Sequence, residues 1–94
     1  MEKIEYDYVI ERITNRREDG RVNPYHRTIA GSRCAVEEAK PGSRGVFLLE
    51  VFNLEDPGYR RWYYTSLIKG VVDTGSGLVI ETMNSSYILR KVVP

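Results

Sequence analysis

Turn-forming residues cut this chain into short segments, and that spacing is the strongest constraint on its fold. Residues 56–58 read Asp-Pro-Gly and residues 73–77 read Asp-Thr-Gly-Ser-Gly, and each lies between runs of apolar residues. Such turn signals recur about every 8–14 residues, a spacing typical of short strands. No amphipathic segment between them has the length of a typical helix. The chain is therefore predicted to be all-β.

About six strands are expected. Residues 46–52 form a nearly continuous apolar run, which predicts a central strand buried on both faces. Within a long strand over residues 59–73, Gly70 indicates a bulge or bend. Strict alternation along that strand would place Trp62, Tyr64, Ile68 and Val72 on one side, and Tyr63, Leu67 and Val71 on the other. The remaining strands are predicted over residues 4–14, 32–37, 78–83 and 87–93.

The chain has 94 residues, which is the size of one small domain spanning residues 1–94. Six strands in an open sheet would leave two exposed edges, and curling into a barrel removes most of that edge. We therefore expect a small, partly open antiparallel barrel of the Src-homology type, with a two-layer sandwich as the alternative. Residues 34–40 could instead form a single helical turn, since they include several good helix formers.

Charge and cysteine content exclude several functional classes. Fourteen basic and thirteen acidic residues give a net charge of +1, which provides no global field for holding a polyanion. Cys34 and His26 are the only cysteine and histidine, so no disulfide within the chain and no multi-cysteine metal centre is expected. Cys34 is predicted to fill a core position, the alternative being a nucleophile–base pair with His26. We expect a cytoplasmic protein with no cofactor, no metal and no membrane partner.

Residues 71–77, Val-Val-Asp-Thr-Gly-Ser-Gly, resemble the active-site signature of aspartic proteases. The resemblance implies a dimeric hydrolase in which Asp73 of two chains would share a proton and activate water. In that family the signature lies early in the chain and is followed by a flap hairpin and a later apolar–glycine strand. Here only 21 residues follow Asp73, and no glycine occurs beyond Gly77. A hairpin turn, with Gly75 and Gly77 at positive φ, explains the same residues and is the favoured interpretation.

The segment Tyr59, Arg60, Arg61, Trp62 and Tyr63, continued by Tyr64, interleaves rings with guanidinium groups and is the candidate binding site. Tyrosine, tryptophan and arginine are enriched where proteins contact one another. We expect a non-enzymatic module that binds another protein or a second copy of itself, with residues 15–24 as a mobile loop that gates the site. The alternative function is weak binding of single-stranded nucleic acid through the same rings and arginines. If Trp62 and Tyr64 are instead core residues, Arg60 and Arg61 would lie over the rim.

The sequences Thr65-Ser66-Leu67-Ile68 and Thr82-Met83-Asn84-Ser85-Ser86-Tyr87-Ile88-Leu89 resemble a pattern in small uncharacterised bacterial and phage proteins. Those proteins end in a Thr-Ser strand and an Asn-Ser hairpin. The resemblance covers about a third of the chain and implies a compact β domain in a bacterial or mobile-element context. It implies no activity.

Overall fold

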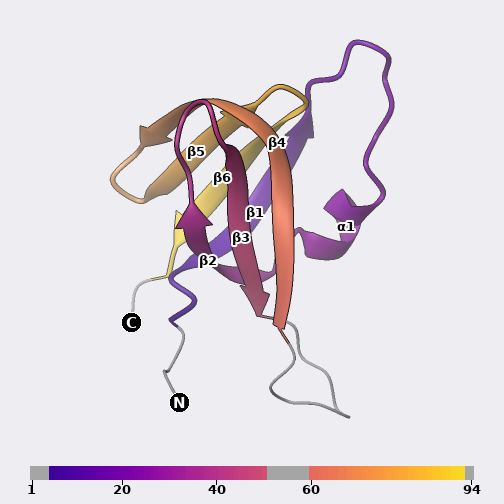
Figure 1. The fold of residues 1–94 in the computed structure, drawn as a ribbon. Helices are drawn as coiled ribbons and strands as arrows, with labels where there is room; N and C mark the ends of the chain where they lie inside the picture. The colour runs from indigo at the N-terminus through magenta and orange to yellow at the C-terminus, as the bar shows by residue number, and fades with distance from the viewer. Residues whose placement is uncertain (1–4, 51–59, 93–94) are drawn as a thin grey trace.

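The computed structural model describes residues 5–50 and 60–92, and in this part of the chain it is an all-β domain with one short helix (Figure 1). The predicted all-β class is therefore confirmed. The turn predicted at residues 56–58 lies outside the described residues. The elements are β1 (Tyr8–Asn15), α1 (Tyr25–Ile29), β2 (Arg33–Glu38), β3 (Arg44–Glu50), β4 (Arg60–Asp73), β5 (Gly77–Thr82) and β6 (Ser85–Lys91).

The six strands form a closed barrel in which every neighbouring pair is antiparallel. Each strand pairs with the next in sequence, and β6 returns to pair with β1 over nearly its whole length. The expected barrel is thus present, but it is closed rather than partly open. The narrowest seam joins β1 to β2, where only Tyr8 with Cys34 and Val9 with Arg33 are in register. Closure leaves none of the described strands as a free edge, which is the outcome that a small sheet of this kind favours.

The core fills the barrel with alternate residues from all six strands. Phe47 and Tyr63 have ring centroids 6.3 Å apart, and the ring of Tyr87 meets that of Phe47 edge-on at 5.6 Å. Cys34 is fully buried among these residues, which confirms its predicted core position. Burial raises the pKa of the Cys34 thiol to about 12, so that a thiolate nucleophile is absent at neutral pH. The buried cluster comprises Ile10, Ile29, Cys34, Phe47, Leu49, Tyr63, Ile68, Ile80, Tyr87 and Leu89.

Two register shifts in β4 decide which of its side chains enter the barrel. Val46 pairs with Tyr64 and Arg44 with Leu67, so β4 carries one extra residue opposite β3. A second shift lies between Ile68 and Gly70, where the bulge was predicted. Because each extra residue reverses the alternation, the strictly alternating faces predicted for this strand are wrong. Tyr63, Thr65 and Ile68 are buried, whereas Trp62, Tyr64, Leu67 and Val72 are exposed.

The helix α1 was not predicted from the sequence. Its five residues follow Pro24, which occupies the N-cap position with helical backbone angles. The segment is too short to show helical periodicity, and the Asn-Pro dipeptide before it is equally typical of a turn. Its role is to place Ile29 in the core and His26 at the end of the barrel. Residues 33–38 form strand β2, so the helical alternative for residues 34–40 is set aside.

The Asp73–Gly77 sequence forms the β4–β5 hairpin turn. The carboxylate of Asp73 accepts a hydrogen bond from the Gly75 amide at 2.8 Å, and the Thr74 amide donates to the Gly77 carbonyl at 3.0 Å. Gly75 has a φ of +84°, as predicted. Gly77 does not have a positive φ, so that prediction is wrong, and a glycine is required at this position for a different reason. A Cβ on Gly77 would overlap the carbonyl oxygen of Leu89 on β6.

A single methyl group at Gly77 is therefore predicted to separate β5 from β6. The G77A variant should lose at least about 2 kcal/mol of unfolding free energy, because backbone atoms of two paired strands must move apart. Gly70→Ala is the matched control, since its Cβ would have no neighbour within 4 Å. It should change stability by less than about 0.5 kcal/mol. Urea denaturation measures both, and equal effects from the two substitutions would contradict this packing.

Candidate functional site

The outer surface of β3 and β4 carries three large exposed side chains with an arginine beside them. We call this surface the ring face and define it as Arg44, Trp62, Tyr64 and Leu67. Trp62 is 51% exposed, Tyr64 is 54% exposed and Leu67 is 48% exposed. The guanidinium carbon of Arg44 lies 5.7 Å from the centre of the Tyr64 ring, within the range of a cation–π contact. The ring face is thus a strip of large side chains that stay about half exposed to solvent in the folded chain, and the Arg44 guanidinium stacks on one of its rings.

Cross-strand neighbours extend the ring face sideways. Trp62 pairs with Leu48, which is only 3% exposed, and Tyr64 pairs with Val46. Val46 in turn pairs with Glu38 on β2, so a carboxylate stands at the side of the strip. Paired residues on neighbouring strands point to the same side of a sheet. The ring face therefore has an apolar centre and a margin that contains both signs of charge.

The described side chains of the predicted binding segment do not lie together: one is exposed and the other is in the core. Tyr59 lies outside the described residues, and Arg60 and Arg61 are described only as backbone of β4. Trp62 is exposed on the ring face, whereas Tyr63 is 8% exposed and belongs to the core. Trp62 and Tyr64 are not core residues, so that alternative prediction is wrong. The bulge between Tyr64 and Leu67 places them on the opposite side of β4 from the buried Ile68.

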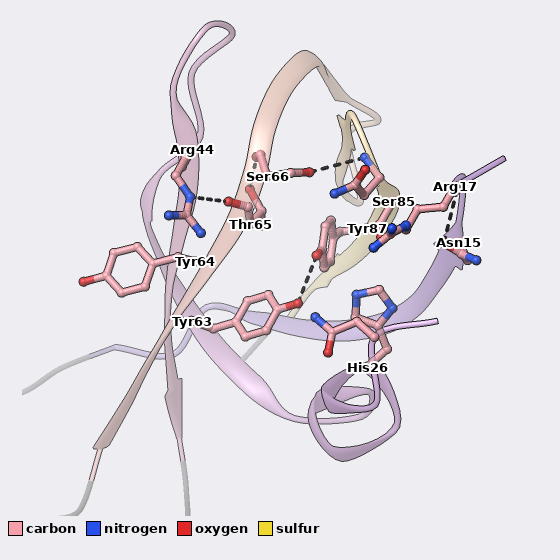
Figure 2. Close-up of a pocket in the computed structure, with 12 residues that line it drawn as sticks. Asn15, Arg17, His26, Arg44, Tyr63, Tyr64, Thr65, Ser66, Ser85 and Tyr87 are labelled. Carbon is pink, nitrogen blue, oxygen red and sulfur yellow. Dashed lines mark hydrogen bonds between the residues drawn. The ribbon is translucent and has the colours of Figure 1, made fainter. Parts of the chain in front are cut away.

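A polar cavity of about 220 Å³ opens at one end of the barrel, and we call it the mouth pocket (Figure 2). It lies where the end of β1, the chain leading into α1, the middle of β4 and the start of β6 come together. Arg44 and Tyr64 belong both to this pocket and to the ring face, so the two surfaces are continuous. The lining residues are Asn15, Arg17, Asn23, His26, Arg44, Tyr63, Tyr64, Thr65, Ser66, Asn84, Ser85 and Tyr87.

Two tyrosine hydroxyl groups and a histidine ring form the inner wall of the mouth pocket. The hydroxyl groups of Tyr63 and Tyr87 are hydrogen-bonded at 3.1 Å, and the His26 ring meets the Tyr87 ring edge-on at 5.9 Å. Burial raises the pKa of the Tyr87 phenol and lowers the pKa of the His26 imidazole from its ordinary value. Both groups are consequently neutral at pH 7, which leaves arginine as the source of charge in the pocket.

Arg44 is anchored at one nitrogen by a backbone carbonyl and stacks on the Tyr64 ring. Its Nε donates to the carbonyl oxygen of Thr65 at 2.7 Å. The Thr65 hydroxyl group in turn accepts from the Gly45 amide at 2.7 Å and donates to the Ser66 carbonyl at 2.7 Å. Among the described residues, no carboxylate lies within ion-pairing distance of the Arg44 guanidinium. The backbone of β4 therefore fixes the direction of this side chain while its charge stays available.

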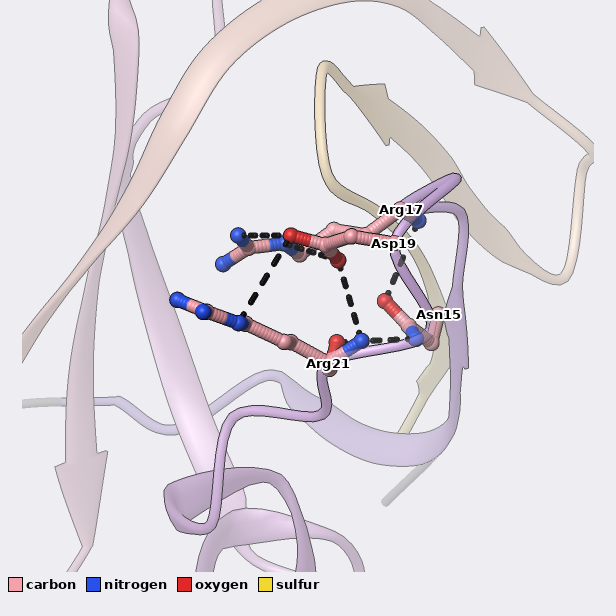
Figure 3. Close-up of polar contacts among 4 residues, drawn as sticks. All are labelled: Asn15, Arg17, Asp19 and Arg21. Atoms are coloured by element: carbon pink, nitrogen blue, oxygen red, sulfur yellow. Dashed lines mark hydrogen bonds and ion pairs between the residues drawn. The ribbon is translucent and has the colours of Figure 1, made fainter.

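Arg17 approaches the pocket from a loop organised by one carboxylate (Figure 3). Asp19 accepts two hydrogen bonds from the Arg17 guanidinium, at 2.6 and 3.1 Å, and a third from the Arg21 amide at 3.0 Å. These donors lower the pKa of the Asp19 carboxyl group, the Arg17 side chain most of all. The side chain of Asn15 closes the loop by donating to the Arg21 carbonyl at 3.0 Å. The predicted mobile loop thus has a hydrogen-bonded local structure.

The described residues that line the mouth pocket include no aspartate or glutamate. The described part of the chain also holds no cluster of three or more histidine, cysteine, aspartate or glutamate residues that could bind a metal ion. What converges instead is a set of donors: two guanidinium groups, amides and hydroxyl groups. Asp73 lies away from this site, at the exposed β4–β5 turn, where its carboxylate caps the turn. No helix among the described residues is long and apolar enough to span a membrane.

Sequence reasoning did not identify the mouth pocket. Its residues come from positions as far apart as 15 and 87, and none forms a spaced motif. The Thr-Ser and Asn-Ser sequences that carry the resemblance described above were not interpreted as a site, although Thr65, Ser66, Asn84 and Ser85 line the pocket. They meet at the pocket, where the Ser66 hydroxyl group accepts from the Asn84 amide at 3.3 Å. Thr82 and Ser85 form a reciprocal pair beneath them, with hydrogen bonds of 2.9 and 3.0 Å.

Comparison with known proteins gives no match for this chain: no protein family, no curated protein and no solved structure is significantly similar to it.

The lowered pKa of His26 predicts a loss of stability in mild acid. Unfolded chains take up the imidazole proton near pH 6.5, whereas the folded chain takes it up only at lower pH. The stabilisation is therefore complete above about pH 6.5 and falls as the pH drops toward the folded-state pKa, by at most about 1.4 kcal/mol per pH unit. Denaturation at pH 7 and pH 5 should show a smaller pH effect in His26→Gln than in the wild type. Identical pH dependence in both proteins would contradict the burial of a neutral His26.

Proposed function

We propose that this domain is a non-enzymatic binding module, and that its ring face receives a segment of a partner protein. The observation that carries the proposal is the exposure of Trp62, Tyr64 and Leu67 in one strip, each about half accessible to solvent. Tryptophan, tyrosine and arginine are enriched among the residues that dominate the energy of protein–protein contacts, and the two aromatic side chains bury large areas with only two rotatable bonds each. A partner that covers this strip would remove that area from water.

Charge favours a protein over single-stranded nucleic acid as the occupant. Glu38 is paired with Val46, which is paired on its other side with Tyr64, and Glu50 is exposed at the end of β3. A phosphate chain stacked on Trp62 and Tyr64 would pass near these carboxylates, which repel it. A protein segment can meet the same margin with charges of either sign. The net charge of +1 adds little attraction for a polyanion.

Alanine substitution of the two exposed rings tests the ring face directly. Affinity capture from the source cells, followed by isothermal titration with each captured protein, should give dissociation constants at least tenfold weaker for Trp62→Ala and for Tyr64→Ala. The loss is expected because each ring contributes area that alanine cannot bury.

Val72→Ala is the matched control, because Val72 is 59% exposed on the same strand but lies beyond both bulges. It should leave the dissociation constant unchanged. Unaltered binding by both ring variants would refute the proposal, as would binding that tracks the number of phosphates and falls steeply with salt. Sedimentation at several protein concentrations decides whether the partner is a second copy, since a dimer held by this face would dissociate in W62A.

A further inference from the structure

Among the described residues, the guanidinium of Arg44 in the mouth pocket forms no ion pair, and no carboxylate lines the pocket. The Arg44 guanidinium uses only Nε in its bond to Thr65, which leaves the two terminal nitrogens without a carboxylate among the described residues. In Figure 2 the side chains of Arg44 and Arg17 stand on opposite sides of the Tyr63–Tyr87 hydroxyl pair. A pocket built in this way attracts anions and excludes cations.

We propose that the mouth pocket is a binding site for a small oxyanion, a carboxylate or a phosphate group, held chiefly by Arg44. The planar fork of an arginine matches two oxygens of either group, and a guanidinium held by a backbone carbonyl loses little freedom when it binds. The pocket shares Arg44 and Tyr64 with the ring face, whereas Trp62 does not line it. A volume of about 220 Å³ leaves room for the anionic group together with the first atoms attached to it.

The neutral members of the pocket explain why an oxyanion, and not a buried ion pair, completes the site. Tyr87 and His26 carry no charge at pH 7, and their burial makes each charged form costly. Arg17 is already neutralised by Asp19, whose carboxylate holds it through two hydrogen bonds. Arg44 is thus the one cation of the described lining residues whose charge stays unbalanced, and hydroxyl and amide donors from Ser66, Ser85 and Asn84 lie along the same wall.

Titration with acetate, inorganic phosphate and neutral acetamide tests this site on the whole chain. Two-dimensional NMR at constant ionic strength, maintained with sodium chloride, separates specific binding from screening. Acetate or phosphate should shift the amides of Ser66, Asn84 and Ser85 in a saturable manner, with a dissociation constant on the order of 1 mM. Saturable shifts with acetate but not with phosphate would identify a carboxylate as the bound group, and the reverse result would identify a phosphate.

Arg44→Gln should abolish these shifts, whereas Arg90→Gln, which removes the same charge near the other end of β6, should retain them. If Arg44→Gln does not fold, the map of shifts on the wild-type chain decides the question without it. Shifts that do not saturate, that spread over exposed arginines elsewhere, or that acetamide reproduces would overturn the proposal. The ring-face variant W62A and its control V72A should both bind acetate like the wild type, so that failure of the ring face and failure of the pocket are distinguishable.

Discussion

The pairing of β6 with β1 is the constraint on which the rest of this structure depends. Seven residue pairs, from Tyr8 with Lys91 to Asn15 with Ser85, close the meander into a barrel. The closure continues into the loops, because the Arg16 amide donates to the Asn84 carbonyl at 2.8 Å and the Val92 amide donates to the Asp7 carbonyl at 2.7 Å. Without this pairing the sheet would have two open edges and no enclosed core. The N-terminal and C-terminal parts of the chain are therefore interdependent in stability.

Closure also creates the mouth pocket. Asn15 at the end of β1 and Ser85 at the start of β6 are paired in register, so the loop after β1 is held against the β5–β6 turn. Arg44 reaches the same place from β3, where it lies opposite the bulge in β4 and donates its Nε hydrogen to the Thr65 carbonyl. The same bulge completes the ring face, since the extra residue places Leu67 on the exposed side together with Trp62 and Tyr64. One backbone irregularity thus links the two surfaces that the proposals use.

The sequence allowed the all-β class and the six strands to be predicted, because short apolar runs and turn residues are local signals. Gly70 marked its bulge and residues 73–77 marked their turn for the same reason. The face of β4 could not be predicted, because the shift between Tyr64 and Leu67 carries no glycine or proline. The requirement for Gly77 was attributed to its φ, yet it arises from the approach of Leu89, which is a tertiary contact. The pocket depends on such long-range contacts throughout, and this is why the candidate site of residues 59–63 captured only part of it.

Native-state hydrogen exchange tests the closed barrel most directly. The backbone amides of the β1–β6 ladder, around the pairs Ile10–Leu89 and Ile13–Tyr87, should exchange with the same free energy of opening as the amides of β3 and β4. That shared value would equal the free energy of global unfolding, because a closed barrel cannot open one seam of this length alone. Exchange at the β1–β6 seam with a markedly lower free energy would show a sheet that opens there, and would contradict the dependence of the pocket on closure.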